Sequence, residues 1–149
     1  MKIYLASDHA GFQLKNELVS HLKRKGMDAI DCGAMVYDEN DDYTEWIPKA
    51  IKPLLADLRH SKAIILGGSG QGEAMVANRF PGIRATVYYG GDKKILELSR
   101  EHNDANVLSL GARFLSDDEA KEAVDTWLAA SFSNEERHVR RNKAIEKIS

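Results

Sequence analysis

Residues 64–78 read Ile-Ile-Leu-Gly-Gly-Ser-Gly-Gln-Gly-Glu-Ala-Met-Val-Ala-Asn, an apolar run that leads through four glycines into a segment with helical character. A strand, a glycine loop and a helix in this order aim several backbone N–H groups at one point, which suits the loop to bind an anion. A P-loop carries Lys after its last loop glycine, whereas this chain has Glu73, which argues against a nucleotide phosphate. A carboxylate beside N–H donors instead suits proton transfer with stabilisation of the resulting oxyanion. The alternative is a tight turn whose glutamate only complements the helix dipole.

Strand-like and helical patterns alternate along the whole chain on both sides of this loop. We expect strands at residues 2–6, 28–31, 63–66, 84–88 and 107–110. We expect helices at about 11–25, 46–58, 71–78, 92–101, 116–130 and 134–148. Pro53 should kink or break the second of these helices. The alternation predicts one α/β domain over residues 1–149, with a five-stranded parallel sheet covered by helices on both faces.

Composition limits the class of protein. The chain has 149 residues, of which 43% are hydrophobic and 30% charged, as is typical of globular proteins. Its 21 basic and 23 acidic residues give a net charge of −2, so no general attraction to nucleic acid or to membranes is expected. The first residues lack the apolar core of a signal peptide, and the single cysteine, Cys32, fits a reducing cytoplasm. No spacing of Cys or His predicts a metal site.

Ligands of parallel sheets bind beyond the carboxyl ends of the strands. This rule selects the segments 7–11, 67–73, 88–92 and 111–113. The first of them, Ser7-Asp8-His9-Ala10-Gly11, places a carboxylate next to an imidazole, a combination that can contact sugar hydroxyls and a phosphate. Alternatively, Ser7 or Asp8 caps the following helix and His9 is only exposed.

Two further sets of polar residues lie outside these segments. His102 and Asn103 precede the fifth strand, at the end of the sheet opposite to the glycine loop, so they reach a ligand only if another subunit brings them there. Arg137 and Arg141 are four residues apart, on one face of the last predicted helix, with no acidic residue three or four positions away. Two unpaired arginines suit a dianionic phosphate, with Arg113 as a third candidate, although charged tails are commonly just solvated.

Five segments together resemble the type B ribose-5-phosphate isomerases, whose wider family includes galactose-6-phosphate and allose-6-phosphate isomerases. They are Ser-Asp-His-Ala-Gly at 7–11, Gly-Gly-Ser-Gly-Gln-Gly-Glu-Ala at 67–74, Ala-Asn-Arg-Phe-Pro-Gly-Ile-Arg-Ala at 77–85, Ser-Arg-Glu-His-Asn-Asp-Ala-Asn-Val at 99–107 and Arg-His…Arg at 137–141. The resemblance implies a three-layer, Rossmann-like α/β/α sandwich with strand order 2-1-3-5-4. It also implies a homodimer or a dimer of dimers with clefts at the subunit interface, a last helix close to the active site or to the partner, and neither metal nor organic cofactor.

The resemblance also implies roles for single residues in a proton transfer between C1 and C2 through a cis-enediolate. One branch of the family has a cysteine base at the position of Gly67 and another a glutamate base at that of Glu73, and this chain resembles the glutamate branch. Amides of Gly68, Gly70, Gln71 and Gly72 would stabilise the enediolate, with Ser69 close to the reacting carbons. His102 would open the furanose ring, Asp8 and Asn103 would contact sugar oxygens, and the phosphate contacts would be His9, Arg113, Arg137 and Arg141.

Three other functions stay open at this point. A hexose-phosphate isomerase of the same family would differ in pocket depth, which we expect to involve Tyr43, Tyr88, Tyr89 and Gly90. A non-catalytic sugar-phosphate sensor or inactive subunit would be expected to lack the base or the ring-opening acid, and this chain keeps both. A flavodoxin-like phosphate or flavin module would fit the fold but explains neither Glu73 nor the paired arginines.

Overall fold

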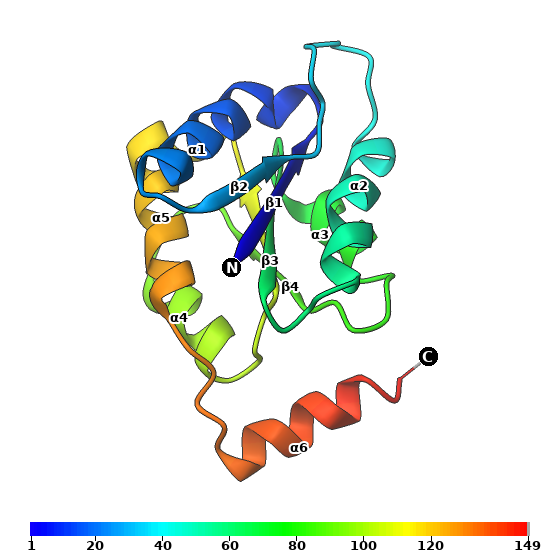
Figure 1. Cartoon of the computed structure of the whole chain (residues 1–149), viewed down its shortest axis with the longest axis vertical. Helices are drawn as coiled ribbons and strands as arrows, with labels where there is room; N and C mark the ends of the chain where they lie inside the picture. The colour runs from blue at the N-terminus through cyan, green and yellow to red at the C-terminus, as the bar shows by residue number, and fades with distance from the viewer. Residues whose placement is uncertain (149) are drawn as a thin grey trace.

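Five parallel strands form the centre of the chain, which the computed structural model describes over residues 1–148 (Figure 1). The strands are β1 (Lys2–Ser7), β2 (Asp28–Asp31), β3 (Ser61–Gly67), β4 (Ala85–Tyr88) and β5 (Val107–Gly111). Their order in the sheet is β2-β1-β3-β5-β4, which confirms the expected order. The helical elements are η1 (His9–Gly11), α1 (Phe12–Arg24), α2 (Tyr43–Leu55), α3 (Gln71–Ala77), α4 (Lys94–Glu101), α5 (Asp117–Ala129) and α6 (Glu136–Ile145).

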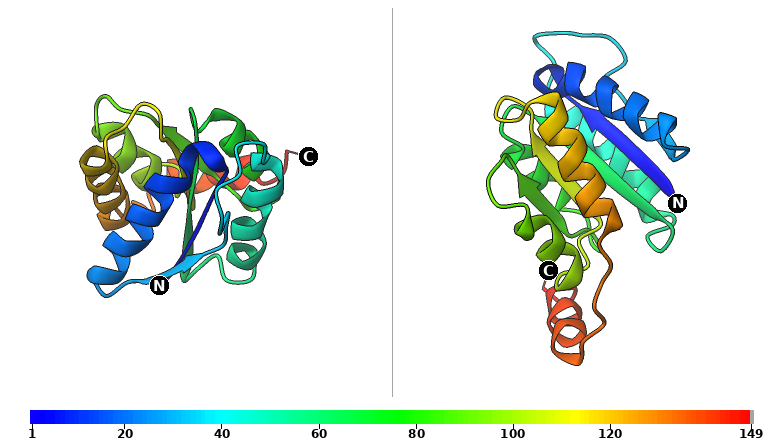
Figure 2. Two further views of the ribbon diagram at one scale, coloured as in Figure 1. Left: turned by 90° about the horizontal axis from the view of Figure 1, so that it is seen from above. Right: turned by 90° about the vertical axis from the view of Figure 1, so that its left-hand side faces the viewer.

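Helices cover both faces of the sheet, with α1, α4 and α5 on one face and α2 and α3 on the other (Figures 1 and 2). The strand positions that the helices cover are mostly apolar on both faces, and Ser109 of β5 is a buried exception. Leu5, Ile64 and Leu108 are partners across β1, β3 and β5 and pack under α1 and α5. The neighbouring Ala6 and Ile65 pack under α2. The three-layer architecture is therefore confirmed.

The second and the last helix differ most from the sequence-based prediction, and the last one runs from Glu136 to Ile145, not from 134 to 148. The second helix runs from Tyr43 to Leu55, not from 46 to 58, and it continues for two residues past Pro53. The proline lies in the last turn, where its missing N–H costs a single hydrogen bond near a helix end. The predicted start of α5 is confirmed: Ser116 Oγ accepts from the Glu119 amide at 3.2 Å and Glu119 Oε2 accepts from the Ser116 amide at 2.8 Å.

The last helix, α6, stands apart from the three layers. It follows an extended segment after α5 and lies across the end of the sheet where the strands begin (Figures 1 and 2). The carboxyl ends of the strands, with the glycine loop, are at the other end of the molecule. None of the described helices combines the length and the apolar character that crossing a membrane requires.

Candidate active site

A cleft of about 540 Å³ opens at the carboxyl ends of the strands. Its walls come from the turn after β1, the glycine loop after β3, the start of α2 and the segment after β5. The residues that line it are Asp8, His9, Ala10, Tyr43, Gly68, Ser69, Gly72, Glu73, Arg113 and Phe114. Every predicted site residue from segments 7–11, 67–73 and 111–113 is therefore in this cleft or on the loop that forms it.

The glycine loop holds Glu73 in a tight backbone arrangement. Gly70 has φ +76°, a left-handed conformation that favours glycine, and its carbonyl accepts a hydrogen bond from Ser109 Oγ at 2.6 Å. Gly67 leaves room for the carboxyl group of Glu73, because a Cβ atom on Gly67 would overlap it. The loop thus turns the first residues of α3 back over the end of β3, and Glu73 lies at the bottom of the cleft.

Glu73 is only 4% exposed. Burial raises the pKa of its carboxyl group above the ordinary value. A hydrogen bond from the backbone amide of Glu73 itself lowers this pKa, and the nearby charge of Asp8 raises it further. A raised pKa brings a carboxylate closer to neutral pH, where a general base removes protons from carbon most effectively. No basic side chain contacts this carboxylate among the described residues, so it is available to a ligand.

The amides of the glycine loop are available to an anion. Within residues 1–148, the backbone N–H groups of Gly68, Ser69, Gly70 and Gly72 have no hydrogen-bond acceptor. The N–H group of Gln71 points to Ser69 Oγ at 3.4 Å. Unpaired amides beside a buried carboxylate are the arrangement that stabilises negative charge on an oxygen next to the carbon that loses a proton.

Asp41 is a site residue that sequence reasoning missed. Its Oδ1 accepts from the His9 amide and from His9 Nδ1, both at 2.8 Å, and its side chain is 7% exposed. This hydrogen bond is the main cause that raises the pKa of His9, with Asp8 adding to it and burial opposing it. Asp8 caps η1 by accepting from the Ala10 and Gly11 amides, and its pKa is raised chiefly by burial. The sequence carried no signal for Asp41, because it lies in the loop 33–42, 32 residues after His9.

Asp8, His9 and Asp41 also form the group closest to a metal-binding geometry, with ligand atoms within 4.8 Å of one another. His9 Nδ1 and Asp41 Oδ1 are already partners, and Asp8 Oδ1 accepts from two amides. In this group a carboxylate holds the imidazole of His9 and raises its pKa. Arg113 completes the wall: its guanidinium lies against Gly68, and its amide donates to the Gly68 carbonyl at 3.1 Å.

The other predicted residues lie at the opposite end of the sheet. His102 ends α4, Asn103 follows it, and five residues of β5 separate them from the level of the glycine loop, roughly 16 Å at the rise of a strand. The imidazole of His102 stacks on that of His138 from α6, with ring centres 4.2 Å apart. His138 itself is buried, and its pKa is lowered by burial and by the proximity of His102.

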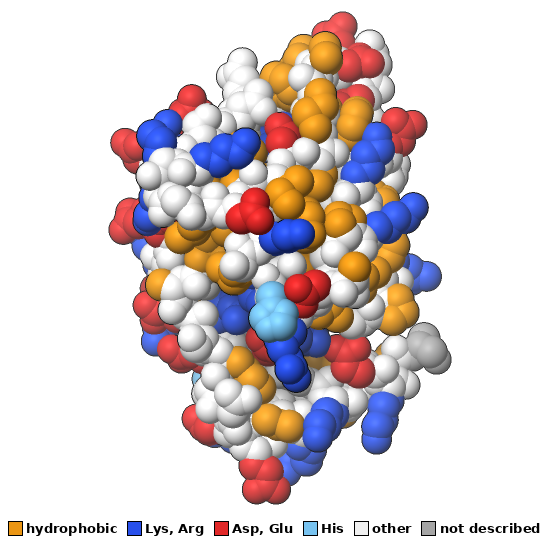
Figure 3. Space-filling model, viewed as in Figure 1, with side chains coloured by type: hydrophobic (Ala, Val, Ile, Leu, Met, Phe, Trp, Pro, Cys, Tyr) orange, Lys and Arg blue, Asp and Glu red, His pale blue; other side chains and the backbone are white. Residues whose placement is uncertain are grey.

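Arg137 and Arg141 are exposed on α6, beside His138. Figure 3 shows Lys and Arg side chains along the lower end of the molecule, where α6 lies. The expectation that both arginines are unpaired is wrong for Arg137, whose Nε donates to Glu135 Oε2 at 2.9 Å. Glu135 precedes the helix with extended backbone and can therefore fold back along it. The predicted site residues thus lie in two groups at opposite ends of the sheet, one with Glu73 and one with His102.

Comparison with known proteins decides the family. The family model described as Ribose/Galactose Isomerase matches residues 3–145. The chain belongs to the ribose/galactose isomerase family. It is 41% identical over 141 residues to ribose-5-phosphate isomerase B of Mycolicibacterium paratuberculosis, covering 95% of this chain and 87% of that protein. It is 38% identical to ribose-5-phosphate isomerase B of Escherichia coli, with 99% and 95% covered.

Solved structures of the ribose/galactose isomerase family have the same fold. One is ribose-5-phosphate isomerase B from Mycoplasma genitalium with bound ribulose-5-phosphate, with a TM-score of 0.93 and 35% sequence identity. The match covers 98% of this chain and 94% of that one. Another is ribose-5-phosphate isomerase B from Clostridium thermocellum, with a TM-score of 0.92 and 39% identity. The resemblance noted in the sequence is confirmed at the level of the family and of the fold.

Proposed function

We propose that this chain interconverts ribose 5-phosphate and ribulose 5-phosphate as an aldose–ketose isomerase. One observation carries the proposal: the buried carboxyl group of Glu73 lies beside unpaired amides of the glycine loop, in a chain whose relatives are named for this isomerisation. A flavin or nucleotide module has no use for a carboxylate with a raised pKa in its phosphate loop. The same group is what a proton transfer between neighbouring carbons requires.

Glu73 acts as the base on the open-chain sugar. Its carboxylate removes the proton from C2 of the aldose, the C2–H electrons form the C1–C2 double bond, and O1 becomes an oxyanion. The loop amides of Gly68, Gly70, Gln71 and Gly72 stabilise the resulting cis-enediolate, with Ser69 next to the reacting carbons. The carboxylic acid then returns the proton to C1, while the proton of the C2 hydroxyl moves to O1. The ketose forms without any net gain or loss of protons.

The two groups of site residues come together in a homodimer. His102 of a second copy opens the furanose ring of the sugar bound next to Glu73, with Asp8 and the second copy's Asn103 on sugar oxygens. Arg137 and Arg141 of that copy bind the phosphate together with His9 and Arg113. The position of α6 supports this arrangement, because the arginines and His102 lie on one unit, away from the cleft of their own chain. A free, half-buried Cys32 is consistent with a cytoplasmic enzyme.

Turnover on a panel of sugar phosphates tests the proposal. The purified chain should convert ribose 5-phosphate to ribulose 5-phosphate, and a Glu73→Gln variant prepared in parallel should not. Tyr43 packs against Gly72 and narrows the cleft, which favours the five-carbon substrate over allose 6-phosphate and galactose 6-phosphate. Faster turnover of a six-carbon substrate would assign the chain to the hexose branch of its family. Binding of ribose 5-phosphate without any turnover would make it a sensor.

A further inference from the structure

Arg84 is the residue before β4, and both its backbone N–H group and its carbonyl group are hydrogen-bonded to Asn106. The Arg84 amide donates to Asn106 Oδ1 at 2.9 Å, and the Asn106 amide donates to the Arg84 carbonyl at 3.1 Å. Asn106 is itself buried, and its Nδ2 donates to the Gly82 carbonyl at 2.8 Å. The side chain of Arg84 therefore starts from a rigid base.

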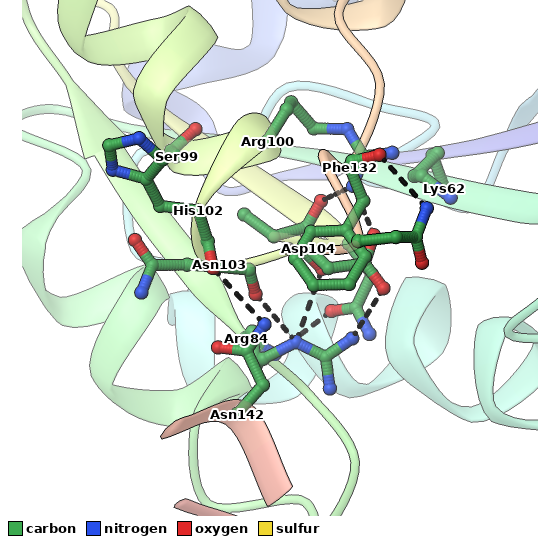
Figure 4. Close-up of polar contacts among 12 residues, drawn as sticks. Lys62, Arg84, Ser99, Arg100, His102, Asn103, Asp104, Phe132 and Asn142 are labelled. Atoms are coloured by element: carbon green, nitrogen blue, oxygen red, sulfur yellow. Dashed lines mark hydrogen bonds and ion pairs between the residues drawn. The ribbon is translucent and has the colours of Figure 1, made fainter. Parts of the chain in front are cut away.

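The guanidinium of Arg84 contacts two segments that are far apart in the sequence, and Figure 4 shows its contacts with the first of them. Nε donates to the carbonyls of Asn103 at 2.9 Å and Asp104 at 3.1 Å, and Nη2 donates to Asp104 Oδ2 at 3.1 Å. Nη1 donates to Glu146 Oε1 at 2.5 Å. The planar fork of an arginine can serve several acceptors at once, which the single ammonium of a lysine cannot do in the same geometry.

The first segment is the turn of residues 102–106, which we call the His102 turn. Its Asp104 has φ +45°, a left-handed conformation that aspartate adopts more readily than most residues with a side chain, but at some cost in energy. Contacts from outside help to keep the turn in one shape. Asp104 receives them from two arginines, Arg84 on Oδ2 and Arg100 on Oδ1 at 2.8 Å. Arg84 also holds the carbonyl of Asn103, next to His102 (Figure 4).

The second segment is α6, which is attached to the body through polar groups. Its buried residues are His138 and Asn142. His138 stacks on His102, Asn142 Nδ2 donates to the His102 carbonyl at 3.2 Å, and Glu146 binds Arg84. These three residues are spaced by four and form one face of the helix. Arg137 and Arg141 each precede a member of this face by one residue, so a rotation of α6 that breaks its contacts also displaces both arginines.

We infer that Arg84 is a positioning residue that joins the His102 turn to α6, so that the ring-opening acid and the phosphate-binding arginines meet a substrate as one unit. The inference rests on the proposed function for its readout. Arg84 does not line the cleft around Glu73, and it acts through Asp104 on one side and Glu146 on the other. The two contacts predict separate kinetic effects. The contact with Asp104 positions His102, the ring-opening acid, whereas the contact with Glu146 positions the arginines that bind the phosphate.

Three variants separate these effects. Glu146→Gln weakens only the contact with α6 and should raise KM for ribose 5-phosphate about fivefold with kcat within about twofold of wild type. Arg84→Met breaks both contacts and should raise KM by a similar factor and lower kcat about tenfold, because a misplaced group loses rate steeply. The double variant should have no higher KM than Arg84→Met alone, because both changes break the same link. A merely structural role would lower the melting temperature without this split between KM and kcat.

Arg24→Met is the control for the loss of charge, since it removes one positive charge at an exposed position at the end of α1, and it should leave both constants unchanged. Independent, multiplying effects of Arg84→Met and Glu146→Gln on KM would overturn the inference, as would wild-type kinetics of either variant.

If Arg84→Met does not fold, Glu146→Gln alone decides the α6 link. Calorimetric titration with inorganic phosphate tests the same link without turnover. Phosphate should bind more weakly to Glu146→Gln than to wild type. A chain without turnover on any sugar phosphate but with this phosphate effect would reject the proposed function and keep the inference.

Discussion

The carboxyl group of Glu73 occupies the space at the bottom of the cleft that a side chain on Gly67 would need. A Cβ atom on Gly67 would overlap the Glu73 carboxyl group, with the more distant oxygen, Oε2, only 2.7 Å away. The resemblance seen in the sequence places a cysteine base at position 67 in one branch of the family and a glutamate base at position 73 in the other. The geometry gives a physical reason for this alternative, because a side chain at 67 and the carboxyl group of Glu73 cannot both occupy that space.

Glu73→Gln should abolish isomerisation and spare substrate binding, because the amide keeps the shape of the side chain but cannot accept a proton. The loss of a general base lowers kcat roughly 100- to 10,000-fold. Gly67→Ala should also lower kcat, by pushing the carboxyl group out of place. In the wild-type enzyme kcat should fall as the pH drops through the raised pKa of Glu73, above the usual carboxylate range. Near-normal turnover of Glu73→Gln would remove Glu73 from its role.

Alkylation of the thiol should leave the enzyme active. Cys32 follows β2 and is half-buried, and burial together with the charge of Asp31 raises its pKa to about 11. The reactive thiolate is therefore scarce at neutral pH. Treatment with iodoacetamide and the Cys32→Ser variant should both retain kcat, as measured in the isomerase assay. Inactivation that ribose 5-phosphate prevents would contradict the assignment to the glutamate branch.

The pH dependence of KM should report the pair of His9 and Asp41. Asp41 raises the pKa of His9, so the imidazolium that contacts the phosphate persists above the ordinary histidine range and is lost only as the pH rises through this raised pKa. In Asp41→Asn the loss should begin at lower pH, closer to about 6.5. The measurement is KM between about pH 5.5 and 9 for both proteins, since titration of the substrate phosphate near pH 6 affects them equally. Superimposable profiles would show that Asp41 does not control His9.

Arg137→Ala and Arg141→Ala should raise KM much more than they lower kcat. Each loses a charge-assisted contact with the phosphate of roughly 1.5–3 kcal/mol. The effect should be smaller for Arg137, because its guanidinium must give up the hydrogen bond to Glu135 before it can bind the phosphate. Arg140→Ala removes an exposed arginine of the same helix that is not among the predicted phosphate contacts, so it serves as the control and should keep KM. Inorganic phosphate should compete with ribose 5-phosphate, less effectively in the two variants. Unchanged KM in both would leave α6 as a solvated helix.

Inactive subunits with different defects should restore activity to each other. Glu73 lies at the carboxyl end of the sheet and His102 at the other end, so in the proposed two-fold dimer each cleft would combine Glu73 of one copy with His102 of the other. Mixing Glu73→Gln with His102→Ala under random exchange makes half of the dimers hybrid, each with one intact cleft. Activity should recover to roughly a quarter of wild type. Hybrids that mass spectrometry confirms but that stay inactive would place both residues in the site of one chain.

Local patterns in the sequence were sufficient for the fold and for half of the candidate site. The alternation of strands and helices predicted the three layers, and the helix expected at 116–130 is α5, which begins at the capping box of Ser116 and Glu119. The segments 7–11 and 67–73 were placed in one cleft by a general rule, because the carboxyl ends of parallel strands share one edge of the sheet. Such features depend on neighbours within a few residues or on sheet geometry common to all parallel sheets.

Other relationships became visible only in the tertiary structure. Asp41 meets His9 across 32 residues, and Arg84 meets Glu146 across 62, so no local spacing could reveal either pair. The burial that raises the pKa of Glu73 also comes from packing that the sequence does not display. The sequence by itself determined which chemical groups the chain has and at which end of a strand each lies. The tertiary structure alone decided in which direction their pKa values shift and which groups lie together, because both depend on contacts between segments that only the folded chain brings together.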